Sequence, residues 1–84
     1  MNVGDWLYVN VAHPNHKPIP SKVVVRRVLD ATSFLCAVRG GDDHQFRRTI
    51  RDVMGLCQPD DPQFPTREYA ANCPQPGGRD AKEV

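Results

Sequence analysis

The chain begins with a stretch in which the character of the side chain changes at every residue. Within residues 6–11, each odd position is Leu or Val, and the even positions hold Trp6, Tyr8 and Asn10. Successive side chains of an extended strand point to opposite faces, so the aliphatic side chains share one face and the aromatic rings share the other. The sequence therefore predicts a first strand with a buried aliphatic face and an exposed aromatic face.

A second strand is predicted over residues 21–29, which are rich in β-branched valine. Val23 and Val25 share one face, but Val28 joins that face only if one extra residue is inserted near position 26. This pattern predicts a β-bulge there. Such bulges allow a short sheet to curl into a barrel.

Residues 34–39 alternate in the same way and predict a third strand, and the Gly-Gly-Asp-Asp run after it predicts a hairpin turn. The fourth strand is expected over residues 44–50, where Arg48 shares a face with Phe46. That position puts Arg48 at the mouth of a barrel, unless the strand slips by one residue. The alternation is lost over residues 51–56, where the three-residue spacing of Val53 and Leu56 predicts a single 3₁₀ turn, and a short last strand could follow from Leu56.

Residues 13–20 contain three prolines and two histidines. Proline has no backbone N–H and is confined to edge strands and turns, so we predict a long exposed loop between the first two strands. The spacing of His13 and His16 would suit half of a zinc site, but no second pair of ligands is clustered with them. We therefore predict no metal site.

The composition changes after Cys57, because residues 58–84 hold five of the eight prolines and few aliphatic side chains. Such a segment buries too little apolar surface to offset the entropy of ordering it, so we predict a largely flexible tail. Residues 66–72 are an exception, because Thr66 could cap a short helix that carries Tyr69. A helix this short is stable only when it docks on the barrel or on a partner.

Together these patterns predict an all-β fold with one domain over residues 1–57, followed by the Pro-rich tail over residues 58–84. The domain is expected to be an SH3-like small barrel of four to five antiparallel strands with a 3₁₀ turn. A chain of 84 residues leaves no room for a second domain of ordinary size.

Several short segments resemble known families of small barrels. Val-Gly-Asp-Trp-Leu-Tyr-Val at 3–9, Pro-Ser-Lys-Val-Val at 20–24 and Ser-Phe-Leu-Cys-Ala-Val at 33–38 resemble the first three strands of Tudor-like barrels. The same opening, with Val-Leu-Asp at 28–30 and Thr-Ile-Arg-Asp-Val at 49–53, is similar to the C-terminal SH3-like domain of retroelement integrases. The resemblance implies the barrel architecture and no particular ligand, because a shared fold does not define a function.

Motifs of catalysis are missing from the sequence. There is no Gly-rich phosphate loop between a strand and a helix, no nucleophile elbow, and no Glu in residues 1–57. We therefore predict no enzymatic activity, no cofactor and no small-molecule substrate.

The sequence contains no run of about 18 apolar residues, and its three cysteines lack the paired spacing of a secreted disulfide scaffold. These observations predict a soluble, unexported, cytoplasmic protein with no membrane contact and with free thiols. Cys36 is expected in the core. Cys57 and Cys73 could pair if the protein met an oxidant.

Charge is distributed unevenly, with eight Lys or Arg against five Asp in residues 1–57 and an excess of acidic groups in the tail. Strand placement brings basic side chains beside two aromatic rings, and the predicted ligand-binding residues are Trp6, Tyr8, Lys22, Arg26, Arg39 and Arg47. Guanidinium groups bind phosphate through paired donors and aromatic rings stack on bases, so nucleic acid is the leading predicted partner. The alternative is a protein–protein interaction module that uses the same face, such as a small phage-type or mobile-element-type adaptor or inhibitor.

Overall fold

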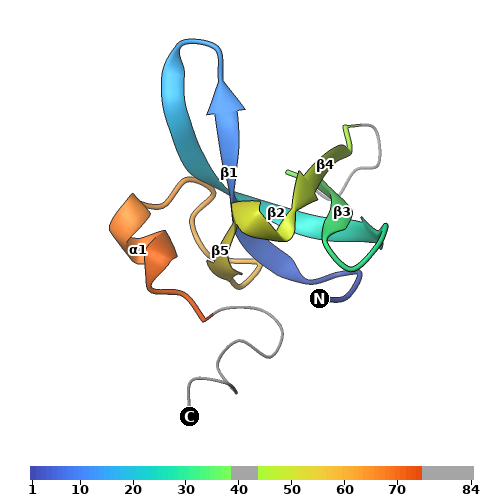
Figure 1. Ribbon diagram of the computed structural model, residues 1–84. Coiled ribbons are helices and arrows are strands. Elements are labelled where there is room, and N and C mark those ends of the chain that lie inside the picture. The colour runs from blue at the N-terminus through green and yellow to red at the C-terminus, as the bar shows by residue number, and fades with distance from the viewer. Residues whose placement is uncertain (39–43, 75–84) are drawn as a thin grey trace.

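The chain forms one antiparallel sheet with a short helix beside it (Figure 1). The computed structural model describes residues 1–38 and 44–74. The elements in chain order are β1 (Trp6–His13), β2 (His16–Val28), β3 (Ser33–Ala37), β4 (Phe46–Thr49), the 3₁₀ helix η1 (Ile50–Asp52), β5 (Val53–Leu56) and α1 (Arg67–Ala71). The strand order is β4-β3-β2-β1-β5. The predicted all-β class with one 3₁₀ turn is confirmed, but the predicted place of the turn, at Val53 to Leu56, is wrong, because these residues form β5. A register shift opposite Val9 lets Val53 and Leu56 both pack against the core from a strand, which explains their three-residue spacing.

Two features curl the sheet into a barrel-like shape. In β2 the register shifts between Val25 and Arg27, which confirms the bulge predicted near position 26. Helix η1 joins β4 directly to β5, and these are the two edge strands of the sheet. Because three residues of 3₁₀ helix rise only about 6 Å, the two edges must approach each other there. Arg48 of β4 also reaches β1, where its Nε donates to the Asn10 carbonyl at 3.3 Å, as expected for a side chain at the barrel mouth.

The core lies on the aliphatic face that the alternation predicts. Its fully buried side chains come from β1, β2 and β3, and they are Leu7, Val9, Val23, Val25, Phe34 and Cys36. Burial raises the pKa of the Cys36 thiol to about 12. Cys36 is therefore a neutral part of the core at physiological pH.

β1 and β2 extend beyond the rest of the sheet as a projecting hairpin (Figure 1). The exposed loop predicted for residues 13–20 is therefore wrong. β1 runs to His13, β2 begins at His16, and these two residues are paired across the ladder. Only the two residues between them form the turn.

Pro18 and Pro20 lie within β2, although proline has no backbone N–H to donate to a neighbouring strand. They are tolerated where the missing N–H would point away from β1. Lys22 donates its backbone N–H to the Gln63 carbonyl at 3.0 Å, on the side away from β1. Pro20 and Pro18 stand two and four residues earlier, and alternate N–H groups of a strand point to the same side. At Pro20 the missing N–H therefore faces away from β1 and costs the ladder no hydrogen bond. Pro18 lies where the register between β1 and β2 shifts, between the pairs Val11–Ile19 and His13–His16, which is the kind of irregularity that accommodates a proline.

The described part of the tail, residues 58–74, lies across the outer face of the sheet. The predicted helix is confirmed as α1, and its N-cap Thr66 accepts the Tyr69 N–H at 3.2 Å. Ala70 of α1 is fully buried, and the helix packs against β2 and β5. Docking on the barrel thus stabilises a helix that is too short to persist alone. Residues 75–84 of the predicted flexible tail lie outside the described residues.

Candidate binding face

The face of the sheet opposite the core carries the residues predicted to bind a ligand. On this outer face, register pairs Trp6 of β1 with Val24 of β2, and Tyr8 with Lys22. The tail covers the half of the face that carries Tyr8 and Lys22. It leaves part of the half toward β3 and β4 open.

Tyr8 lies beneath the tail and is 0% exposed, so its predicted exposure is wrong. Its hydroxyl donates to the Pro62 carbonyl at 2.9 Å, and its ring meets the Tyr69 ring edge to face, with centroids 6.1 Å apart. Tyr69 in turn donates its hydroxyl to Asp61 Oδ1 at 3.2 Å. Burial raises the pKa of Tyr8, so its phenol stays neutral and keeps its donor proton.

Lys22 is also enclosed by the tail, with only 9% of its surface exposed. Its ammonium group donates to the Pro59 carbonyl and, at 2.7 Å, to the Asp61 carbonyl. The same ammonium lies 5.3 Å from the centroid of the Trp6 ring. An ammonium group has three donors, and here two are bound to the tail. Lys22 therefore holds the tail on the sheet, and the prediction that it is open to phosphate is wrong.

Hydrogen bonds to the sheet fix the tail at two further points. Gln63 accepts the Lys22 N–H at 3.0 Å and donates from Nε2 to the Lys22 carbonyl at 2.7 Å. At the other end of the tail, the Leu56 N–H donates to the Pro74 carbonyl at 2.6 Å. The described tail is thus part of the folded unit.

Gly55 of β5 makes the close approach of the tail possible. A Cβ at this position would lie 2.7 Å from the Cβ of Cys73 and 2.9 Å from its carbonyl oxygen. Any side chain here would push the tail away from the strand. An isolated glycine within a strand is a known sign that another backbone comes close, so this was a sequence signal for the docked tail.

The open half of the outer face carries a row of three residues on three neighbouring strands. Arg27 of β2 pairs with Leu35 of β3, and Leu35 pairs with Arg47 of β4. Both arginines are exposed, and Leu35 between them is partly exposed. Arg47 donates to the Ser33 hydroxyl at 3.0 Å, which orients its guanidinium group along the sheet. We call Arg27, Leu35 and Arg47 the arginine row.

Trp6, Arg26 and Arg47 are the predicted site residues that remain at least partly exposed. Arg39 lies outside the described residues. Sequence reasoning missed Arg27, although a signal was present. The bulge in β2 moves Val28 to the core face, and the same shift moves Arg27 to the outer face.

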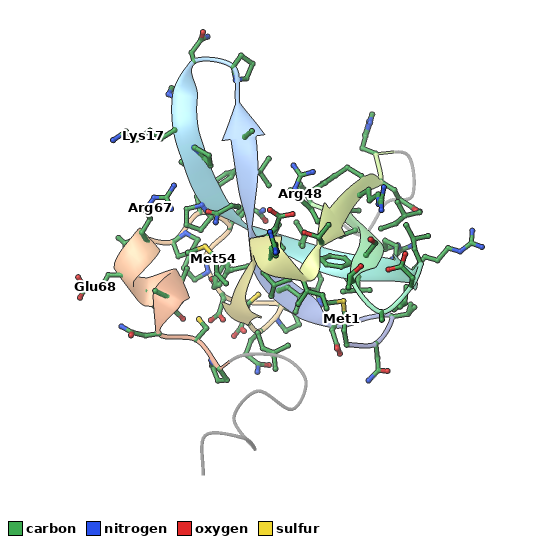
Figure 2. All side chains as sticks on the ribbon, in the orientation of Figure 1. Met1, Lys17, Arg48, Met54, Arg67 and Glu68 are labelled. Carbon is green, nitrogen blue, oxygen red and sulfur yellow. The ribbon has the colours of Figure 1, made fainter. Side chains whose placement is uncertain are left out.

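Carboxylates near the ends of β2 and β4 are held by local hydrogen bonds. Asp30 accepts from the Thr32 N–H at 2.8 Å and from the Thr32 hydroxyl at 3.1 Å, which lowers the pKa of Asp30. Asp52 accepts from the Thr49 N–H at 3.1 Å at the start of η1. Glu68 on α1 points away from the barrel (Figure 2). Within the described part of residues 1–57, the six Lys or Arg other than the enclosed Lys22 are at least partly exposed and stand against three Asp, so the barrel surface is basic.

An apolar cavity lies at the end of the barrel away from the hairpin, where Figure 2 places Met1. Its volume is about 240 Å³, and its apolar lining consists of Met1, Val28, Ala31, Phe34 and Ile50. Val28 is 44% exposed and Ile50 is 46% exposed. The cavity is therefore bordered by apolar side chains that are open to solvent.

Compared with protein-family models, curated proteins and solved structures, the chain has no match. Among the described residues, no three His, Cys, Asp or Glu side chains gather as ligands for a metal ion. Within the same part of the chain, no helix has the length and apolar character to cross a membrane. Function is therefore inferred from the residues themselves.

Proposed function

We propose that this protein is a non-catalytic binding module that contacts nucleic acid through the outer face of β2, β3 and β4. The observation that carries the proposal is the arginine row, in which two exposed guanidinium groups flank an apolar side chain. Neighbouring strands lie about 4.8 Å apart, so the Cα atoms of Arg27 and Arg47 are about 10 Å apart. Two arginine side chains anchored at this separation can contact different phosphates of one strand.

Trp6 supplies the second element of such a face. Trp6 is partly exposed on the same outer face of the sheet, where its ring lies 5.3 Å from the Lys22 ammonium group that holds the tail. An aromatic ring beside a basic groove stacks on unpaired bases, and stacking tolerates any base sequence. Trp6 and Leu35 would therefore contact bases or sugars, and the arginines would contact phosphates. This division of roles favours single-stranded nucleic acid without sequence preference.

A salt titration with matched variants tests the proposal. Binding of a fluorescein-labelled single-stranded oligonucleotide is measured by anisotropy over a range of salt concentrations. For the wild type, the logarithm of the affinity should fall linearly with the logarithm of the salt concentration. Arg27→Ala and Arg47→Ala should each reduce that slope by about 0.7, because each removes one phosphate contact.

Arg67→Ala is the matched control, because it removes the same charge from an exposed position on α1. Its slope should equal that of the wild type, and thermal melting verifies that each variant is folded. Equal loss of affinity in all three variants would indicate a general charge effect and would contradict a role for the arginine row. No binding at low salt would remove the proposal altogether.

A second candidate function, recognition of a protein partner, is favoured by the apolar cavity. One apolar side chain of a partner could enter between Val28, Phe34 and Ile50, where exposed apolar surface borders the opening. Panning a random peptide library against the wild type and against Ile50→Asp tests it. Enriched peptides should share an apolar anchor and bind only the wild type, whereas enrichment that is indifferent to Ile50 would reject this function.

A further inference from the structure

Cys57 and Cys73 lie on opposite sides of the contact between β5 and the tail. Both are free thiols, and both line one cavity of about 510 Å³ together with Asp61 and Tyr69. Cys57 follows β5 directly and donates its backbone N–H to the Trp6 carbonyl at 2.9 Å. The extended backbone therefore continues through Cys57.

The two cysteines are close because each is close to Gly55. The Cβ of Cys73 lies 2.7 Å from the point where a Gly55 Cβ would be. Cys57 stands two residues after Gly55 in extended backbone, so its side chain points to the same face, about 6.6 Å further along. A disulfide needs Cβ atoms about 3.5–4.5 Å apart. These two lengths place the Cβ atoms of Cys57 and Cys73 roughly 4–9 Å apart, so movement of the tail along β5 toward Cys57 brings them into that range.

We propose that Cys57 and Cys73 form a disulfide site that links the end of β5 to the end of the tail. The chemical partner is a small-molecule disulfide such as oxidised glutathione. One cysteine thiolate attacks it, which releases one reduced glutathione and leaves a mixed disulfide. The second cysteine then attacks the protein sulfur of that mixed disulfide and releases the second glutathione. Two protein thiols are thereby oxidised to one disulfide, and one glutathione disulfide is reduced to two thiols.

The linked state would hold residues 58–72 in a closed loop against the sheet. This loop includes the groups that bind Lys22 and Tyr8, namely the carbonyl oxygens of Pro59, Asp61 and Pro62. Oxidation would therefore fix the covered half of the outer face. The inference does not depend on whether the open half binds nucleic acid.

The reaction is expected to be slow at neutral pH. Burial raises the pKa of the Cys57 thiol to about 12, and the charge of Asp61 contributes to the rise. Burial also raises the pKa of Cys73. Thiolate is the attacking species, so below these pKa values the rate should rise up to tenfold for each unit of pH. The site thus differs from a rapid redox sensor, whose cysteine has a low pKa.

Mass spectrometry with oxidised glutathione at mildly alkaline pH tests the site. The wild-type protein should lose two hydrogen atoms without retaining glutathione. Trypsin cleaves after Arg67, between the two cysteines, so the digest should contain two peptides joined through Cys57 and Cys73. Cys57→Ser and Cys73→Ser are matched controls, and each should stop at the mixed disulfide with glutathione.

A parallel reaction in urea separates the folded geometry from chance pairing. The ratio of internal disulfide to glutathione adduct should be at least tenfold higher in the native protein than in urea. Reduction of the native product should also lower its melting temperature. An equal ratio in both conditions, an internal link to Cys36, or stable glutathione adducts on native Cys57 and Cys73 would each overturn the proposal.

Discussion

Replacing Lys22 with methionine distinguishes the enclosed lysine of the structure from the exposed lysine that the strand pattern predicts. Methionine keeps most of the aliphatic length of the side chain and removes the ammonium group, which donates to the Pro59 and Asp61 carbonyls. A hydrogen bond from a charged group contributes about 1.5–3 kcal/mol. Water would replace part of each bond, because Pro59 is exposed and Asp61 is partly exposed. We therefore expect a total loss of about 2 kcal/mol.

A loss of that size is easily measured in a domain this small. Each 1 kcal/mol corresponds to about 4–8 °C in melting temperature, so Lys22→Met should melt about 8–16 °C below the wild type. Lys17→Met is the control, because Lys17 is an exposed lysine on the projecting hairpin and its loss should cost less than about 0.5 kcal/mol. Thermal unfolding followed by circular dichroism provides the comparison. Equal melting temperatures for the two variants would refute the enclosure of Lys22 by the tail.

Three further perturbations address the same contact. Gly55→Ala places a methyl group against Cys73 and should destabilise the fold by about 1–3 kcal/mol in urea unfolding, whereas a neutral effect would mean that the tail is not in contact with β5. Deletion of residues 58–84 uncovers Tyr8 and should cost at least about 2 kcal/mol, and an unchanged melting curve would contradict docking. Tyr8→Phe removes the donor to Pro62 and should cost about 1 kcal/mol at neutral pH. The pKa of Tyr8 is raised from 10.0 in the folded state, so folding favours the neutral phenol, and stability should fall as pH rises above 10.0. Tyr8→Phe should weaken that alkaline loss, and an unchanged pH dependence would show that Tyr8 titrates normally.

Local patterns predicted the parts of the fold that depend on one strand or one helix. The alternation around Leu7 identified the core face of β1 correctly, the misfit of Val28 located the bulge, and Thr66 marked the start of α1. Each of these signals is short in range. These signals come from the two-residue period of a strand or from the cap of a helix. The tertiary structure of this protein preserves both local patterns.

The candidate site depends on pairing between distant segments, which a strand pattern does not contain. The alternation places Tyr8 on the outer face of the sheet, opposite the core. Only the position of the tail decides whether this outer face is exposed or covered. The prolines of β2 predict a loop from the sequence alone. Whether a proline disrupts a strand depends on whether its missing N–H would face the neighbouring strand, and only the pairing with β1 determines that. The arginine row likewise exists only because β3 aligns Leu35 with both Arg27 and Arg47.

The most direct test of the proposed binding face uses the fluorescence of Trp6, which is the single tryptophan of the chain. Its emission reports, without any label, on an indole that lies on the same outer face of the sheet as the arginine row. Titration with an unlabelled single-stranded oligonucleotide at low salt should quench the emission with a saturating curve, and added salt should restore it. Emission that stays constant while anisotropy shows the oligonucleotide to be bound would place binding elsewhere on the protein and contradict the proposed face.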